Sequence, residues 1–193
     1  EDPQDKKYGG EPTRLEIGDR NRVREFATVH RGTAQDQGVT RIGSDNLLMA
    51  YTHVAHDCRI GDNVIMANAA SLGGHVHIDD WAILGGFTIV HQFCWIGAHS
   101  FCAMGSVQTK DVPPYVTAGG HPARPRGING EGLRRRGFSP EAVAAIKRAY
   151  RALYRSGLKL EEALQRVREI AAAVPEVTPF ADFVGDSSRS IVR

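Results

Sequence analysis

An apolar side chain recurs at every sixth position through the middle of this chain. No polar residue interrupts the series, which consists of Ile42, Leu48, Val54, Ile60, Met66, Leu72, Ile78, Leu84, Val90, Ile96 and Cys102. A period of six matches neither the period of a helix nor the simple alternation of an ordinary strand, so it indicates a structural repeat. Three hexads make one larger period, and we therefore expect a solenoid whose coils each have three short sides.

A second set of smaller side chains stands two positions before the first. It consists of Asn46, Thr52, Cys58, Val64, Ala70, Val76, Ala82, Thr88, Cys94 and Ser100. Residues two apart on an extended segment point to the same side, so both sets are predicted to face the interior. The coils would stack at the strand spacing of ~4.8 Å. A β-sandwich is the alternative, but its strands would not keep one phase over so many periods.

Five short motifs in one order resemble a known family of hexapeptide-repeat transferases, the UDP-N-acetylglucosamine 3-O-acyltransferases of lipid A biosynthesis. They are HVAHDC at 53–58, GGHV at 73–76, VHQFC at 90–94, DVPPY at 111–115 and EGLRRRGF at 131–138. The resemblance extends from about Asp5 to Arg193. It implies an all-β left-handed parallel β-helix, a hexapeptide-repeat solenoid, followed by a small α-helical C-terminal domain. Compared with the family the chain lacks several initial coils, so we expect it to be a fragment.

The domain boundaries follow from where the repeat begins and ends. We expect the β-helix at 1–128, with an excursion loop near 32–40, and the helical domain at 129–193. Consecutive prolines in Asp111–Tyr115 predict the end of the solenoid, and the Gly/Pro-rich run 119–132 predicts a connection. Ser139, Pro140 and Glu141 predict a helix start, because they offer an N-cap, a proline at the first helical position and an acidic first turn. A second helical stripe runs from Leu160 to Val174.

Composition excludes several classes of protein. The chain is 41% hydrophobic and 24% charged with a net charge of +2, which predicts neither nucleic-acid binding nor strong membrane attraction. It contains no apolar run long enough to span a bilayer. Cys58, Cys94 and Cys102 all occupy inward positions, so we expect small core residues in a reducing compartment, the cytoplasm. The resemblance implies neither a cofactor nor a metal.

One outward column is purely apolar. It consists of Leu47, Ile65, Ile83 and Phe101, which stack one coil apart. An exposed apolar column on such a protein predicts a protein partner. The resemblance implies a homotrimer with the solenoid axes side by side.

The histidines carry the predicted chemistry. Stacking places His56, Gly74 and Gln92 in one column and Asp57, His75 and Phe93 in the next. A neutral imidazole is a general base for a sugar hydroxyl, and a glycine N–H is an accessible oxyanion donor. The resemblance implies that His56 deprotonates the glucosamine 3-hydroxyl, that Asp57 orients His56, and that Gly74 stabilises the oxyanion. The hydroxyl would attack the thioester of a 3-hydroxyacyl carrier protein.

The resemblance also assigns substrate contacts. Asp5 and Lys7 would hold the nucleotide sugar; His30, His53, His75, His91 and Gln92 would line a cleft between subunits; and Asn129, Glu131, Arg135 and Arg136 would contact the nucleotide. From the residues alone, the arginine run 134–136 is nearly as well explained as a solvated basic turn. His77, His99 and His121 are interpreted as solvated or structural. The basic face expected on the helical domain would suit an acidic carrier protein.

Met104 matches the family position that closes the end of the acyl groove. Glycine there leaves room for a long chain, whereas methionine shortens the groove. The sequence therefore predicts a preference for a 3-hydroxydecanoyl over a 3-hydroxymyristoyl chain.

Three alternatives remain open. The first is the UDP-3-O-acylglucosamine N-acyltransferase that shares the solenoid. The second is a trimeric zinc enzyme of the carbonic-anhydrase type, with His53, His56 and His75 as ligands. The third is a structural module without activity. The acceptor sugar could also be a 3-amino analogue of UDP-N-acetylglucosamine.

Overall fold

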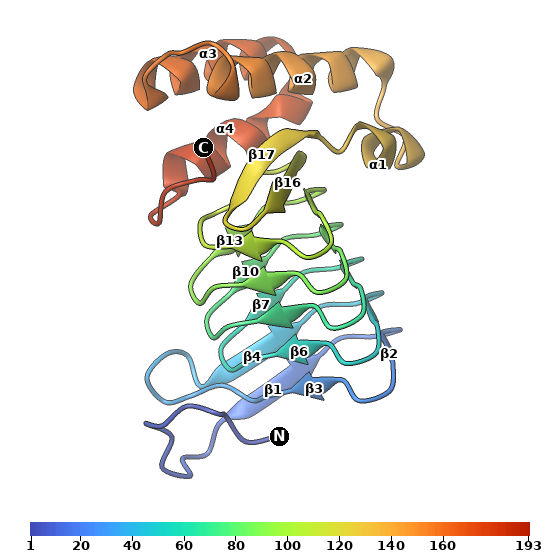
Figure 1. The fold of residues 1–193 in the computed structure, drawn as a ribbon, viewed down its shortest axis with the longest axis vertical. Coiled ribbons are helices and arrows are strands. Elements are labelled where there is room, and N and C mark those ends of the chain that lie inside the picture. Colours follow the sequence, from blue (N-terminus) through green and yellow to red (C-terminus); the bar gives the residue numbers. More distant parts are fainter.

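The computed structural model describes all 193 residues and consists of a parallel β-helix closed at one end by helices (Figure 1). Three sheets run along the solenoid. Sheet A contains β1 (Arg14–Ile17), β4 (Val39–Ile42), β7 (Arg59–Ile60), β10 (His77–Ile78) and β13 (Trp95–Ile96). Sheet B contains β2 (Arg22–Val23), β5 (Leu47–Leu48), β8 (Ile65–Met66), β11 (Ile83–Leu84), β14 (Phe101–Cys102), β16 (Val116–Gly120) and β17 (Ala123–Ile128). Sheet C contains β3 (Thr28–Val29), β6 (His53–Val54), β9 (Ser71–Leu72), β12 (Ile89–Val90) and β15 (Val107–Gln108).

The register follows the hexad repeat. Ile60 pairs with Ile78 and Ile78 with Ile96, so each coil returns to sheet A after three hexads. The first coil is longer, because Ile17 pairs with Ile42. Its extra residues form the loop between β3 and β4. The solenoid with its helical domain confirms the expected fold class.

The interior is filled by the two predicted inward sets. Every member of the first set is at most 3% exposed, and every member of the second set is at most 1% exposed. Burial of these side chains stabilises the stack because each coil covers the apolar surface of the next. The hexad pattern therefore predicted the core correctly.

Each corner of the coil carries a column of residues in the left-handed backbone conformation. The C–A corner, between sheets C and A, contains Asp57, His75 and Phe93; the A–B corner contains Arg20, Asp45, Asn63, Trp81 and His99; and the B–C corner contains Phe26, Tyr51, Ala69 and Phe87. Their φ angles lie between 55° and 65°. This conformation turns the chain sharply, so side chains of successive coils stack at each corner.

The stack of coils continues past Asp111–Tyr115, where the consecutive prolines predicted its end, and its last strand ends at Ile128. Val112 forms a parallel bridge with Ile96, and β16 adds to β14 in parallel, with Phe101 opposite Thr117. β16 then pairs antiparallel with β17, so the run expected as a connection is mostly a hairpin. The prediction that the prolines end the stacking was wrong because Pro113 and Pro114 fall in a corner, where no strand hydrogen bond is required of them.

Helices cover the end of the β-helix (Figure 1). They are α1 (Gly130–Arg135), α2 (Pro140–Tyr154), α3 (Leu160–Ala173), the 3-10 helix η1 (Pro175–Val177) and α4 (Thr178–Asp186). The predicted start of α2 is confirmed, because Ser139 accepts a hydrogen bond from the Ala142 N–H. The arginine run is not a turn but the end of a short helix, capped by Asn129. None of the helices is long and apolar enough to cross a membrane.

The C-terminal tail is tied to the solenoid through Asp111. The Asp111 N–H donates to the Ser190 carbonyl at 3.1 Å, and the Val192 N–H donates to the Asp111 carbonyl at 2.8 Å. The Ser187 hydroxyl donates to the Asp111 carboxylate at 2.6 Å. Ile191 and Val192 are buried. Residues 187–192 are therefore held in a fixed place beside the upper coils.

Candidate active site

His56 and Asp57 form a hydrogen-bonded pair at the C–A corner. His56 Nδ1 lies 2.9 Å from Asp57 Oδ2, and the side chains are 15% and 1% exposed. A carboxylate only accepts, so Nδ1 carries the proton and Nε2 is left with a free lone pair. This tautomer is the one in which the imidazole can act as a base toward the pocket.

Thr33, in the excursion loop, fixes the Asp57 carboxylate. Its N–H donates to Oδ1 at 2.9 Å and to Oδ2 at 3.1 Å, and its hydroxyl donates to Oδ2 at 2.6 Å. The Asp57 N–H donates to the Thr40 hydroxyl at 2.8 Å. The Thr33 N–H, the Thr33 hydroxyl and His56 Nδ1–H together hold this buried carboxylate in one orientation. Sequence reasoning did not identify Thr33, because its contact with Asp57 depends on how the loop folds back.

Gly74 lies against the ring of His56. A Cβ at position 74 would come within 2.6 Å of Cε1 and 2.7 Å of Nε2 of His56, so a side chain there would displace the imidazole. The Gly74 carbonyl accepts from the Phe93 N–H, while the Gly74 N–H makes no hydrogen bond within the chain. A free N–H next to a base can stabilise a developing oxyanion.

His75 closes the same corner. Its ring stacks on Phe93 with centroids 4.4 Å apart and meets the His56 ring edge-on at 5.1 Å. His75 Nδ1 lies 3.0 Å from Asp36 Oδ2. Asp36 belongs to the excursion loop, and the sequence offered it only as a loop residue. The loop therefore acts on both histidines of the corner: Asp36 contacts His75 directly, and Thr33 holds Asp57, which in turn contacts His56.

A pocket of about 900 Å³ opens in front of these side chains. It is lined by Gln4, Asp5, Lys6, Lys7, Gln35, Asp36, His56, His75, Gln92 and Phe93. Five predicted site residues thus meet in one cavity: Asp5, Lys7, His56, His75 and Gln92. The lining residues come from the N-terminal segment, the excursion loop and the C–A corner.

His30 and His53 lie together beside this pocket without lining it. Their rings meet at right angles with centroids 5.0 Å apart, and His53 Nδ1 lies 2.7 Å from the Thr28 hydroxyl. Burial lowers the pKa of both histidines; mutual repulsion adds to the lowering for His30, and the nearby His56 adds to it for His53. His91 is one coil above His75, with Nδ1 3.0 Å from the Gln92 carbonyl, and is also outside the pocket lining.

The predicted nucleotide contacts lie at a different corner. Arg136 stacks over the Trp81 ring at 5.2 Å and places Nη1 3.3 Å from His99 Nδ1. Asn129 donates to the His99 carbonyl at 2.9 Å, and Glu131 pairs with the exposed Arg134 and Arg135. Within one chain Asn129 and Arg136 thus contact residues of the A–B corner, whereas His56 belongs to the C–A corner.

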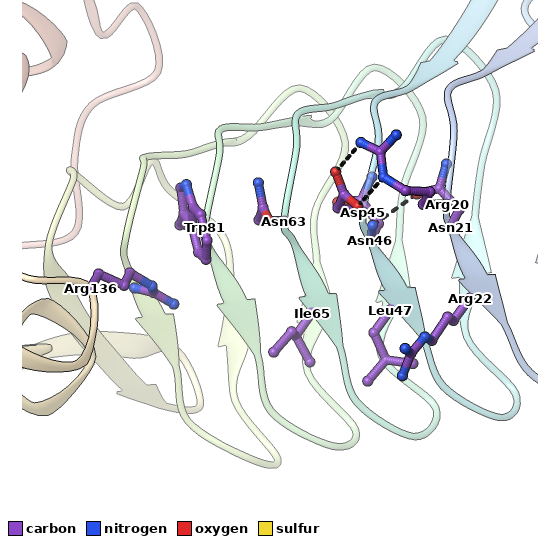
Figure 2. A pocket seen from close by; sticks show the side chains of 10 residues that line it. All are labelled: Arg20, Asn21, Arg22, Asp45, Asn46, Leu47, Asn63, Ile65, Trp81 and Arg136. Carbon is purple, nitrogen blue, oxygen red and sulfur yellow. Dashed lines mark hydrogen bonds and ion pairs between the residues drawn. The ribbon is translucent and has the colours of Figure 1, made fainter.

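Arg136 and Trp81 line one end of a second pocket, of about 690 Å³, at the left of Figure 2. Figure 2 shows Asn63 to the right of Trp81 and, further to the right, the Arg20–Asp45 ion pair, whose shorter contact measures 2.6 Å. The pocket is polar along the corner and apolar at Leu47 and Ile65 of sheet B.

Met104 follows β14 near the B–C corner. Met104 is 77% exposed, and Phe87 in the coil below is also exposed. Within one chain Met104 is therefore separated from His56 by sheet C.

His56, Asp57 and His75 are close enough to be tested as metal ligands, since their ligand atoms lie within 4.8 Å of one another. The Asp57 oxygens, however, already accept three hydrogen bonds from Thr33 and face His56 Nδ1. His53, the third histidine of the zinc alternative, packs on His30 and does not belong to this group. The three histidines are not arranged as a preformed zinc triad.

Comparison with known proteins identifies the family. Residues 111–192 match the family profile "Udp N-acetylglucosamine O-acyltransferase; Domain 2", and residues 40–74 match "Bacterial transferase hexapeptide (six repeats)". The acyl-[acyl-carrier-protein]–UDP-N-acetylglucosamine O-acyltransferase of Thiobacillus denitrificans is 58% identical over 193 residues, with 100% of this chain and 75% of that protein covered. The corresponding enzyme of Herminiimonas arsenicoxydans is 56% identical over 99% of this chain and 74% of that protein.

Solved structures agree. LpxA of Acinetobacter baumannii superposes with a TM-score of 0.97 at 47% identity, covering 100% of this chain and 75% of that one. The UDP-N-acetylglucosamine acyltransferase of Francisella novicida gives a TM-score of 0.97 at 46% identity, covering 100% and 71%. A hexad-built solenoid, a capping helical domain and this degree of similarity place the chain in the UDP-N-acetylglucosamine O-acyltransferase family, and it is an acyltransferase.

Proposed function

We propose that the chain transfers a 3-hydroxyacyl group from acyl carrier protein to the 3-hydroxyl of UDP-N-acetylglucosamine, the first step of lipid A biosynthesis. The observation that carries this proposal is the His56–Asp57 pair directed toward a pocket beside the free N–H of Gly74. The names of the relatives supply the donor and acceptor.

The proposed reaction needs no covalent enzyme intermediate. His56 Nε2 takes the proton of the 3-hydroxyl while the sugar oxygen attacks the thioester carbonyl carbon. The tetrahedral oxyanion is stabilised by the Gly74 N–H, and Asp57 stabilises the imidazolium that forms. Collapse of the intermediate breaks the C–S bond, and the leaving thiolate takes the proton from Nε2. The products are the O-acylated sugar nucleotide and the free carrier thiol.

The active site is proposed to be completed by a second copy of the chain. The pocket at His56 and the pocket at Arg136 lie at different corners of one solenoid, so one molecule of nucleotide sugar would meet both only across an interface. Two apolar surfaces suit such an interface. One is the half-buried column Leu47, Ile65, Ile83 and Phe101; the other, which the sequence did not single out, is the exposed set Phe26, Tyr51, Phe87 and Ile89. A homotrimer with parallel axes would bury both.

The donor is proposed to approach from the helical end. Lys147, Arg148 and Arg151 are exposed on α2 and form a basic surface there. An acidic carrier protein would be attracted to it. Cys58, Cys94 and Cys102 are buried free thiols, which suits the reducing cytoplasm proposed for this reaction.

The proposal is tested by an acyl-transfer assay. The protein is given UDP-N-acetylglucosamine, its 3-amino analogue, or UDP-3-O-acylglucosamine, each with 3-hydroxydecanoyl or 3-hydroxymyristoyl carrier protein. Transfer to UDP-N-acetylglucosamine is the expected result. Transfer only to UDP-3-O-acylglucosamine would replace the proposal with the N-acyltransferase, and carbonic anhydrase activity with bound zinc would replace it with the metalloenzyme.

The assembly is tested separately. Light scattering should give three times the mass of one chain, and Ile83→Asp should reduce both the mass and the activity. A monomer with full activity would overturn the shared active site.

A further inference from the structure

Arg189, in the C-terminal tail, is a half-buried arginine without a carboxylate partner. None of the ion pairs in the structure includes it. Its Nε is buried and has no hydrogen-bond partner. Buried or half-buried cations are normally paired, so an arginine in this state indicates a missing acceptor.

The position of Arg189 is fixed by its neighbours in the tail. Ser187 and Ser190 on either side both hydrogen-bond to Asp111, by side chain and backbone respectively. The Arg189 side chain lies beside the buried thiol of Cys94 and reaches His91, with Nη2 3.5 Å from His91 Nδ1. The tail therefore delivers a positive charge to the C–A corner, the corner that carries His56.

The contact with His91 does not satisfy Arg189. His91 Nδ1 also lies 3.0 Å from the Gln92 carbonyl, a shorter contact that requires Nδ1 to carry its proton. A protonated Nδ1 cannot accept a hydrogen bond from Arg189. The terminal nitrogens of Arg189 thus keep N–H groups without an acceptor at the edge of the proposed cleft.

Arg189 stands between the base and the helical domain. His56, Gly74 and Gln92 occupy successive coils of the corner, so the level of His91 and Arg189 is two strand spacings, ~10 Å, above His56. The helices close the same end of the solenoid (Figure 1). An acyl donor that docks on α2 must pass the level of Arg189 to reach His56. Asp5 and Lys7, the predicted contacts of the nucleotide sugar, instead line the pocket in front of His56.

The geometry points to Arg189 as a binding residue for a substrate phosphate, the phosphodiester of the arm that joins the acyl thioester to its carrier protein. This inference rests on the proposed acyl transfer. A planar guanidinium binds two phosphate oxygens at once, and a phosphodiester supplies the acceptors that Arg189 lacks. Arg189 is a binding residue and takes no part in bond making.

The test compares two small donors that differ only in this phosphate: 3-hydroxydecanoyl-phosphopantetheine and 3-hydroxydecanoyl-pantetheine. The KM for each is measured in wild type, Arg189→Gln, Arg189→Lys and the control Arg166→Gln, an exposed arginine on α3. Wild type and the control should have a KM about tenfold or more lower for the phosphorylated donor. Arg189→Gln should lose most of this preference, and Arg189→Lys should keep part of it.

Further readouts separate the outcomes. Binding of phosphopantetheine itself, measured by calorimetry, reports on Arg189 even if no acyl group is transferred, so failure of the proposed reaction remains distinguishable. An unchanged donor preference in Arg189→Gln would overturn the inference. A raised KM for UDP-N-acetylglucosamine with the donor preference intact would reassign Arg189 to the diphosphate and would equally overturn it. If Arg189→Gln is unstable to heat, Arg189→Lys decides the question.

Discussion

The Cα of Gly74 lies so close to the His56 ring that a Cβ would come within 2.6 Å of Cε1. The glycine is therefore required by the position of the base, independently of any role of its own N–H. Gly86 occupies the equivalent place at the B–C corner, where a Cβ would meet only the Asn68 carbonyl oxygen at 3.4 Å. The two glycines form a matched pair for experiment.

Gly74→Ala should reduce kcat by about a hundredfold or more, because the displaced imidazole can no longer reach the hydroxyl. Gly86→Ala should keep most of the activity. Both variants are compared by steady-state kinetics and by thermal unfolding. Equal activity in the two variants would show that displacement of His56 by a side chain at position 74 does not lower activity.

His56→Ala should lower kcat by at least ~10²-fold, the usual cost of losing a general base. The exposed His121 provides the control, since His121→Gln removes an imidazole away from the pocket. Turnover is followed with UDP-N-acetylglucosamine and 3-hydroxydecanoyl carrier protein. Unchanged turnover in His56→Ala would remove His56 from the proposed role.

Thr33→Val should impair both activity and stability. Loss of the hydroxyl leaves the buried Asp57 carboxylate without its shortest hydrogen bond, which costs about 1–3 kcal/mol of unfolding free energy. The freed Asp57 orients His56 less well, so kcat should fall more than KM changes. Thr33→Ser keeps the hydroxyl and should restore activity; failure of serine to do so would show that packing of the methyl group matters instead.

Met104→Gly should shift donor preference toward 3-hydroxymyristoyl carrier protein. If Met104 closes the acyl groove across the subunit interface, glycine lengthens that groove. The ratio of kcat/KM for the two donors is measured in wild type and variant. Equal rates with both donors in wild type would show that Met104 does not set the chain length.

The stability of the protein should fall as the pH decreases from 6.5 to about 4. Burial, and then the charge of Arg136, lowers the pKa of His99 from 6.5 to about 4. Between these values the unfolded chain binds a proton at His99 that the folded chain does not, so acid favours unfolding, and the loss is complete below about 4. His99→Phe should keep the stacking with Trp81 and Tyr115 and reduce this dependence. Identical slopes of unfolding temperature against pH would contradict this.

The difference between the predicted and observed end of the solenoid has a simple cause. Pro113 and Pro114 cannot donate a strand hydrogen bond, but they lie in a corner where none is needed, and β16 continues the stack. Periodicity identifies which residues face inward; it does not reveal whether a proline falls on a strand or between two strands. The arginine run was ambiguous for a similar reason, since α1 depends on the Asn129 cap and on Leu133, which is buried beneath it.

The sequence by itself determined the core, the stacking of the corner columns and the start of α2, because each depends on local periodicity or on a cap a few residues long. It also placed His56 beside Gly74, since residues one coil apart stack. Only the tertiary structure decided that Thr33 holds Asp57, that Asp36 reaches His75 and that Arg189 lies beside His91. These contacts join an irregular loop or tail to the regular solenoid, and no repeat in the sequence encodes the path by which such a segment folds back.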